Sequence, residues 1–196
     1  CGSRSASGRS APPADPSTSS IERVLVLYVT TPQFSREELA EAFANFEATV
    51  DRAARTKDWD PWANQYTVDV TYVEHAAGTM RSREEVREWI WRTMTTFPGS
   101  HMTAFPSLWS VIDEPTGRII CELDNPMIDP GDGTVISATN LSILTYAGDG
   151  LWCRQEDVYN PLRFASAAMK WCRKARELGT LTDEAAAWME QYGGRA

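Results

Sequence analysis

The chain of 196 residues is long enough for one domain with short appendages, and its hydrophobic content of 42% is sufficient for a core. A net charge of −8 and the absence of a lysine/arginine cluster argue against non-specific binding to nucleic acid, which needs a basic face. No apolar run reaches the roughly 20 residues that span a bilayer.

The first part of the chain differs in composition from the rest. Residues 1–20 contain no large apolar side chain, so we expect a disordered tail, and the β-branched run in residues 21–33 is expected to form an accessory segment. The four cysteines form no CxxC pair, so the spacing of zinc ligands is absent. A disulfide framework is not expected in a chain of this size, which favours a reducing, cytoplasmic compartment. The alternative is a lipoprotein anchored through Cys1, because a Ser/Pro-rich stretch follows that residue.

Deletion of residues 1–20 is expected to change the melting temperature by no more than about one degree, because the segment holds no apolar anchor. Thermal unfolding of the shortened chain checks this. A large drop would show that the tail docks on the domain.

Two helices with capping boxes are predicted in the first half of the chain. Ser35 and Glu38 begin the first, and its apolar stripe at helical spacing comprises Leu39, Phe43, Phe46, Val50 and Ala53. Ser82 and Glu85 begin the second, whose apolar side comprises Val86, Trp89, Ile90, Thr93, Met94 and Phe97. Between them, Asp60 followed by proline predicts an N-cap and a short helix that continues to Tyr66.

A strand is predicted before the second helix, because Val68, Val70 and Tyr72 alternate with polar residues. Continued alternation directs Glu74 to the same buried face as Tyr72, and His75 to the opposite face. A shift of one residue would exchange these two side chains.

In the second half of the chain, apolar residues recur with a period of two, which is typical of strands. Strands are predicted at residues 102–112, 117–128, 134–146 and 151–159, joined by turns rich in glycine and aspartate. Helical segments are predicted at residues 164–172 and 183–191. Helices ahead of a meander indicate an α+β domain, in which a curved sheet wraps around the long first helix and encloses a pocket.

The run KDWDPWANQYTVDVTYVEHAAGTMRSREEVREWI resembles the SnoaL-like branch of the nuclear-transport-factor-2-like (NTF2-like) superfamily. The later runs GRIICELDNPMIDPGDG and ILTYAGDGLWCRQEDVYNP fit the same branch. The resemblance covers residues 34–164 and leaves residues 165–196 as a C-terminal helical extension. It implies an NTF2-like cone, which is a curved, mainly antiparallel mixed sheet around a long N-terminal helix with an internal pocket. It implies no cofactor.

The resemblance also implies roles for individual residues. Glu74 takes the place of the general base of ketosteroid isomerases, and Tyr72 with Glu74 matches the Tyr and Asn that hold water in limonene-epoxide-hydrolase-like members. Asp124 and Asp157 match the two acids of the Asp-Arg-Asp arrangement in those hydrolases. Glu122 stands at the arginine position, and this departure argues against epoxide hydrolysis. Asp157 also matches the acid/base Asp of SnoaL-type polyketide cyclases.

The candidate catalytic residues are therefore Glu74, Asp157, Tyr72, His75 and Asp124. Glu74 is the first choice for the group that moves the proton, Tyr72 for the donor to a substrate oxygen, and Asp157 for the second acid/base. Three of these residues also have a structural interpretation. Asp124 fits the solvated face of the sheet, Asp157 fits a strand-end ion pair, and His75 fits a hydrogen-bonding residue beside the turn.

Two functions remain open from the sequence. The first is a cofactor-free acid/base enzyme of isomerase, cyclase or hydrolase type that acts on an apolar polyketide-, steroid- or terpenoid-like molecule. The second is a non-catalytic ligand-binding or dimerisation module of the same fold. No HxxxH or HxH spacing indicates a metal site. A homodimer through the outer face of the sheet is expected, because the strands offer apolar residues on both faces, with Ile119 opposite in direction to Ile120 and Leu141 opposite to Ile143.

Overall fold

The computed structural model describes residues 33–193, and these belong to one compact unit. The expected tail at residues 1–20, the anchor at Cys1 and almost all of the accessory segment at residues 21–33 lie outside the described residues. No helix in the described part of the chain is both long and apolar enough to cross a membrane.

The first long helix, α2 (Arg36–Thr56), begins as the sequence predicts. The Ser35 side chain accepts a hydrogen bond from the Glu38 backbone N–H at 3.1 Å, which satisfies one of the free donors of the first turn. The predicted stripe is confirmed as the buried face of α2, which comprises Leu39, Ala42, Phe43, Phe46, Val50, Ala53 and Ala54.

The short helix α3 (Asp60–Ala63) differs from its prediction. Its N-cap is Trp59, and Asp60 is the first helical residue, whose backbone N–H donates to the Asp58 side chain at 3.2 Å. The helix ends at Ala63, so Tyr66 is free to begin the first strand.

The second capping box begins α4 (Arg83–Thr95). The Ser82 hydroxyl accepts from the Glu85 N–H at 3.2 Å, and the Glu85 carboxylate accepts from the Arg81 N–H at 2.6 Å. Two short 3-10 helices follow, at Gly99–His101 and Glu114–Thr116.

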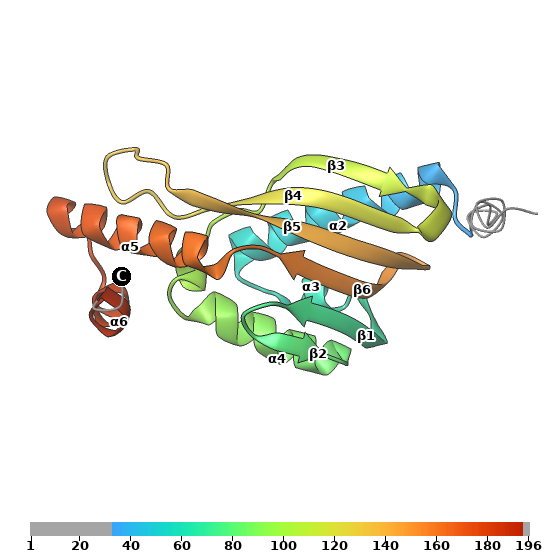
Figure 1. Ribbon diagram of the computed structural model, residues 1–196, viewed down its shortest axis with the longest axis horizontal. Coiled ribbons are helices and arrows are strands. Elements are labelled where there is room, and N and C mark those ends of the chain that lie inside the picture. The colour runs from blue at the N-terminus through green and yellow to red at the C-terminus, as the bar shows by residue number, and fades with distance from the viewer. Residues whose placement is uncertain (1–32, 194–196) are drawn as a thin grey trace, which may run out of the picture. The chain divides into compact units, whose positions relative to one another are not determined.

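Six strands form one sheet in the order β2-β1-β6-β5-β4-β3 (Figure 1). Their bounds are β1 (Tyr66–Glu74), β2 (Gly78–Met80), β3 (Ser107–Asp113), β4 (Arg118–Pro126), β5 (Ser137–Gly148) and β6 (Leu151–Val158). The predicted meander is confirmed as β3 to β6, and β1 joins it parallel to β6. β2 was not predicted, because three residues are too few to show a period.

One apolar residue of β1 does not face inward as the alternation predicts. Val68 is 72% exposed, whereas Tyr66, Val70 and Tyr72 are buried. The pairing of β1 with β6 shifts register between Tyr66 and Thr71, as at a β-bulge. Such an irregularity breaks the two-residue alternation, so Val68 turns outward while Tyr66 takes the inward place.

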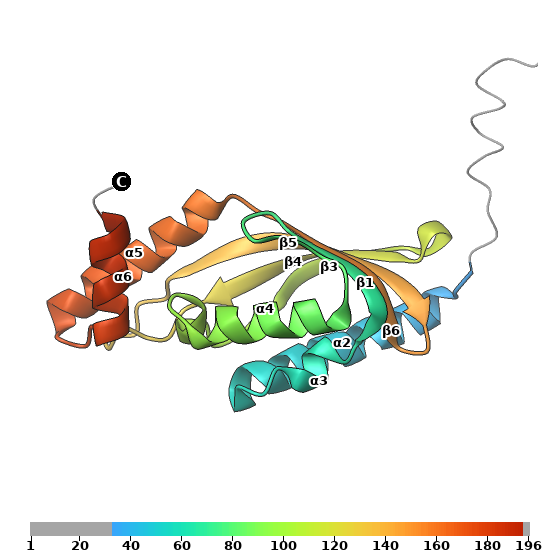
Figure 2. The ribbon, with the colours of Figure 1, turned by 90° about the horizontal axis from the view of Figure 1, so that it is seen from below.

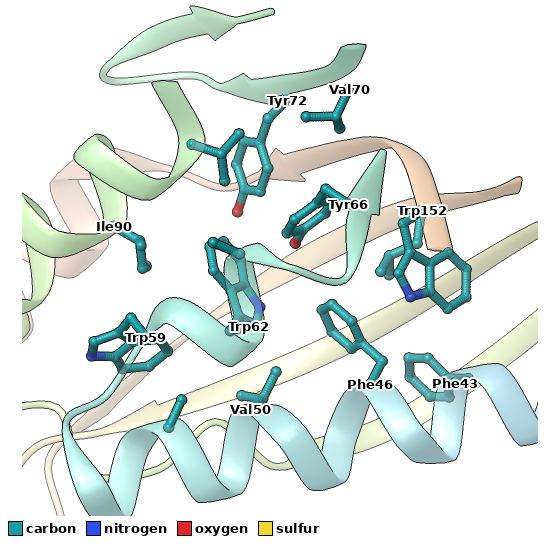
Figure 3. Close-up of a cluster of buried hydrophobic side chains, with 14 of the residues drawn as sticks. Phe43, Phe46, Val50, Trp59, Trp62, Tyr66, Val70, Tyr72, Ile90 and Trp152 are labelled. Carbon is teal, nitrogen blue, oxygen red and sulfur yellow. The ribbon is translucent and has the colours of Figure 1, made fainter. Parts of the chain in front are cut away.

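The helices α2, α3 and α4 lie on one face of the sheet (Figure 2). The core between the two layers is rich in aromatic rings, and Figure 3 shows Trp62, Tyr66 and Trp152 facing the Phe46 side of α2. Ring centroids of Trp62 and Tyr66 are 5.0 Å apart, and those of Phe46 and Trp152 are 5.9 Å apart. Edge-to-face pairs of this kind stabilise a core beyond the area they bury.

The last two helices are α5 (Pro161–Leu178) and α6 (Asp183–Gly193). α5 begins three residues earlier than predicted, because Asn160 caps it and Pro161 occupies the first turn. The expected boundary between residues 164 and 165 therefore lies within α5. A second buried cluster joins these helices to the domain and comprises Phe97, Met127, Ile136, Ala168, Trp171, Cys172, Ala175 and Ala185.

Candidate functional site

A cavity of about 590 Å³ lies between the sheet and the helices that cover it. Most of its lining is apolar, and α5 and α6 contribute Phe164, Ala165 and Trp188 to it. Aromatic side chains of the lining include Trp59, Trp62, Tyr72, Trp89, Phe97 and Phe105. A volume of this size and an apolar lining are typical of pockets that bind small molecules. The C-terminal helices thus form part of the pocket wall.

Seven polar residues of the cavity wall come from inward positions of four strands. They are Tyr72 and Glu74 of β1, Asn125 of β4, Asn140 and Ser142 of β5, and Gln155 and Asp157 of β6. Because β1 and β6 are parallel and in register, Tyr72 lies opposite Gln155, and Glu74 lies opposite Asp157. Neighbouring strands are about 5 Å apart, so the two carboxylates are adjacent in the wall.

Asp157 is the centre of the polar wall. Its Oδ1 accepts hydrogen bonds from the Ser142 hydroxyl at 2.6 Å and from Gln155 Nε2 at 2.9 Å, and its Oδ2 accepts from the Tyr72 hydroxyl. Burial raises the pKa of Asp157 above its ordinary value of 3.8, the three hydrogen bonds offset part of this effect, and the charge of Glu74 adds to it. The sequence did not identify Ser142 or Gln155.

A chain of buried side chains fixes the orientation of the Ser142 hydroxyl. Asn125 Nδ2 donates to Asn140 Oδ1 at 2.9 Å, and Asn140 Nδ2 donates to the Ser142 hydroxyl at 3.0 Å. Because Ser142 Oγ accepts this bond, its own proton is directed at Asp157. The sequence pattern could have identified Asn140 and Ser142 as inward residues. They precede the buried Leu144 by four and two residues on β5, so all three share one face of the strand.

Tyr72 is held as a hydrogen-bond donor. Its hydroxyl accepts from Gln155 Nε2 at 3.1 Å, and the Tyr66 hydroxyl donates to Gln155 Oε1 at 2.5 Å. Burial and the neighbouring Asp157 raise the pKa of Tyr72 well above 10.0, so the phenol keeps its proton at neutral pH.

Glu74 faces the cavity, as the alternation predicted, and is 5% exposed. One carboxylate oxygen accepts from the backbone N–H of Ala76 at 2.9 Å and from that of Ala77, and the other accepts from the Tyr159 hydroxyl. Burial, together with the hydrogen bond to Glu74, raises the pKa of Tyr159 well above 10.0. Tyr159 was not predicted, although it follows Asp157 by two residues and so shares its face.

Comparison with known proteins identifies the fold. Neither a protein-family model nor a curated protein matches the sequence. A structure described as a SnoaL-like polyketide cyclase from Jannaschia sp. CCS1 matches with a TM-score of 0.53 at 12% identity, over 70% of this chain and 96% of that one. An LEH-like epoxide hydrolase of M. tuberculosis matches with a TM-score of 0.54 at 12% identity, over 78% and 99%.

An NTF2-like protein from Anabaena variabilis ATCC 29413 also matches, with a TM-score of 0.50 at 12% identity, over 67% of this chain and 95% of that one. The chain has the SnoaL-like, NTF2-like fold. The fold expected from the sequence is thereby confirmed. Identities this low establish the NTF2-like fold and leave the activity to be argued from the site.

Asp124 does not join the site. On β4 the inward residues are Ile119, Cys121, Leu123 and Asn125, so Asp124 lies on the outer face with Glu122. The Asp-Arg-Asp arrangement that the resemblance implied is therefore not formed in the pocket by Glu122 and Asp124. Leu123 and Asn125 are the β4 residues that line the cavity, and neither is titratable, so Asp157 is the only acid of that pattern in the pocket wall.

His75 lies outside the cavity, on the face opposite Glu74. Its Nε2 is 3.1 Å from Glu156 Oε1, and Glu156 also pairs with Arg154 at 2.8 Å. Arg154 and His75 lower the pKa of Glu156 below 4.5. The structural interpretation of His75, as a hydrogen-bonding residue beside the turn, therefore agrees with its position.

Residues 33–193 contain no group of three or more His, Cys, Asp or Glu side chains placed to hold a metal ion. Asp157, Glu74 and the hydroxyls of Tyr72 and Tyr159 are acid/base groups that line the described pocket.

The stability of the Asp157→Asn variant relative to the parent is expected to rise with pH. Since folding raises the pKa of Asp157, the folded chain binds this proton more readily than the unfolded chain. The contribution of Asp157 to the free energy of unfolding therefore falls as pH rises from about 3.8 through the raised pKa. Asparagine does not titrate, so its contribution stays constant over the same pH range. Urea unfolding of both chains between pH 4 and pH 8 measures the difference.

Glu156→Gln is the matched control, and its stability relative to the parent is expected to change with pH in the opposite direction. The lowered pKa of Glu156 stabilises the folded chain above the unfolded pKa, and this contribution disappears as pH falls. The variant should therefore lose stability relative to the parent as pH rises. A parallel trend in both variants would contradict the assignment.

Proposed function

We propose that the chain binds a mostly apolar small molecule in the cavity and acts on it as a cofactor-free acid/base enzyme. The observation that carries this proposal is the Asp157 carboxyl, whose pKa is raised by burial and which is hydrogen-bonded to Tyr72 in the wall of an aromatic cavity of about 590 Å³. A carboxylate whose pKa is shifted toward neutrality is suited to give and take protons.

Each residue has a role in this proposal. Asp157 moves the proton, and Glu74 is the second acid of the site. The single hydroxyl proton of Tyr72 is donated to Asp157, so Tyr72 positions that carboxyl beside the ligand. Burial keeps Tyr72 protonated, which a donor requires. The cavity volume fits a rigid polycyclic skeleton, such as that of a polyketide-, steroid- or terpenoid-like molecule.

Proton transfer of the isomerase or cyclase type is favoured over epoxide hydrolysis. The hydrolase type of the resemblance uses an arginine between two acids, and the residues that β4 contributes to the described cavity are Leu123 and Asn125, which are neither basic nor acidic. The neighbour from Jannaschia sp. is described as a SnoaL-like polyketide cyclase, which supports the cyclase type.

Non-catalytic ligand binding is the second candidate, and one observation favours it. The carboxylate oxygens of Asp157 and Glu74 each already accept at least one hydrogen bond from the protein, and together they accept six. A carboxylate satisfied in this way also serves to order a pocket.

A hydrogen–deuterium exchange assay separates the two functions without knowledge of the natural product. Polycyclic ketones that bind the full-length chain are incubated with it in D2O, and exchange at the carbon next to the carbonyl is followed by NMR. Acid/base catalysis predicts exchange that is lost in Asp157→Asn and kept in Glu156→Gln. A ketone that binds tightly without exchange in the parent would favour the non-catalytic pocket.

We also propose that two copies pair through the outer face of the sheet. Trp109, Val111, Leu141 and Val158 are exposed apolar residues of β3, β5 and β6 that share this face. The expectation that Leu141 and Ile143 lie on opposite faces is wrong, because they are two residues apart on β5 and both face outward, while Leu144 is buried. The correction enlarges the outer apolar face.

Light scattering at micromolar concentration is expected to give twice the monomer mass of 21.9 kDa. Leu141→Lys, which adds a charge on β5 in the middle of the outer face, should give the monomer, because charged residues are disfavoured at the core of an interface. A parent chain that scatters as a monomer would contradict the pairing.

A further inference from the structure

The cavity combines two acids with very little positive charge. Of the described residues that line it, Glu74, Asp157 and Arg92 are the only ones with an acidic or basic side chain, tyrosines apart. Arg92 is exposed, whereas Glu74 is buried, and the partners of both carboxylates are neutral N–H and O–H groups. Within the described pocket, neither acid is paired with a cation.

The two acids are placed so that they repel each other. Glu74 lies opposite Asp157 in the parallel register of β1 and β6, and its charge contributes to the raised pKa of Asp157. Two carboxylates on neighbouring strands in a buried wall repel each other, which disfavours the state in which both carry a charge. A cation inside the cavity would relieve this repulsion, and an anion would increase it.

The aromatic lining also favours a cation in the cavity. Trp59, Trp62, Trp89 and Tyr72 line the cavity, and ring centroids of Trp89 and Tyr72 are 5.0 Å apart. The face of each ring carries partial negative charge, which attracts a cation within about 6 Å of the ring centre. Carboxylates beside aromatic faces therefore make the interior attractive to organic cations.

We propose that the pocket selects an apolar ligand that carries a protonated amine, and that it discriminates against carboxylates and phosphates. This inference rests on the proposed function, since it requires that the cavity binds a ligand. The hydrocarbon part of the ligand packs against the aromatic rings. Its ammonium group lies at the wall that holds Glu74 and Asp157, and supplies the cation that the pocket lacks.

Three probes with one skeleton test the proposal on the full-length parent chain. They are 1-pyrenemethylamine, 1-pyrenemethanol and 1-pyrenecarboxylate, and their dissociation constants are measured by pyrene fluorescence at pH 7. We expect the amine to bind at least about tenfold more tightly than the carboxylate, with the neutral alcohol between them. The preference should persist in 0.5 M NaCl, which screens attraction to the exposed acidic surface more than interactions inside the pocket.

Variants locate the source of the preference. Glu74→Gln and Asp157→Asn should each reduce the ratio of the amine affinity to the alcohol affinity several-fold. Glu156→Gln is the matched control, because this acid neighbours Asp157 on β6 and does not line the cavity, so the preference should remain. Ala165→Trp fills the cavity wall at α5 and should remove the binding of all three probes.

The outcomes distinguish the inference from the proposed function. A carboxylate that binds as tightly as the amine would overturn the inference and leave ligand binding intact. If no probe binds, or if binding survives Ala165→Trp, the cavity is not the binding site and the proposed function fails as well. The comparison of the three probes needs no variant, so it stands even where a substitution impairs folding.

Discussion

Replacement of Asp157 by asparagine is expected to lower the rate of proton transfer by ~10²–10⁴-fold, which is the usual contribution of a positioned acid/base. Asparagine keeps the size of the side chain, so the cavity and the position of Tyr72 should change little. It cannot take up a proton, and burial has raised the pKa of the parent carboxyl toward the range in which proton exchange is efficient. The rate of ketone deuterium exchange, measured as kcat/KM, provides the readout.

Two further variants make this prediction specific. Glu156→Gln should exchange at the parent rate, because its side chain pairs with Arg154 and His75 outside the cavity. Glu74→Gln should lose less than Asp157→Asn, because Glu74 is bound to two backbone N–H groups and to Tyr159. A larger loss in Glu74→Gln would return the main proton-transfer role to Glu74, as the sequence had favoured.

Trp171→Ala is expected to reduce the free energy of unfolding by about 3–5 kcal/mol, the range for truncation of a buried aromatic residue. Trp171 is 2% exposed and lies in the cluster that joins α5 to Phe97, Met127 and Ile136. Its indole N–H also donates to the Ile128 carbonyl at 2.7 Å, and alanine would leave that carbonyl without this donor. Chemical denaturation measures the change.

Trp91→Ala is the matched control, because Trp91 is 48% exposed on α4. This surface substitution should change the free energy of unfolding by no more than about 0.5 kcal/mol. If Trp171→Ala were equally mild, the C-terminal helices would be an appendage, as the sequence had suggested, and not a part of the folded core.

The sequence predicted the elements of the fold because their signals are local. Ser35 and Ser82 cap α2 and α4 as their capping boxes indicate, and the alternation of the last four strands identified the meander. Glu74 was directed inward by the same argument. Each of these inferences depends on residues within one element, which is the range over which periodicity and capping act.

The rest depends on contacts between elements. The irregularity that turns Val68 outward arises where β1 pairs with β6, and no residue of β1 alone indicates it. Asp124 was assigned by analogy and not by the parity of β4, although Ile119 and Cys121 are buried and Asp124 has the opposite parity. The network from Asn125 to Asp157 joins three strands, so it becomes visible only when their register is known.

The position of α5 and α6 was also beyond local reasoning. The resemblance to NTF2-like proteins ended at residue 164, and amphipathic spacing alone does not tell which surface a helix covers. The structure places Phe164 and Trp188 in the cavity lining, so the end of the chain helps to define what the pocket can hold.

The central claim is that the aromatic cavity beside Asp157 binds an apolar small molecule. Untargeted mass spectrometry of compounds retained through purification, performed in parallel on the parent chain and on Ala165→Trp, tests it most directly. The account predicts an apolar compound that copurifies with the parent and is absent from the variant, whose cavity is filled. A compound retained equally by both chains, or by neither, would contradict it.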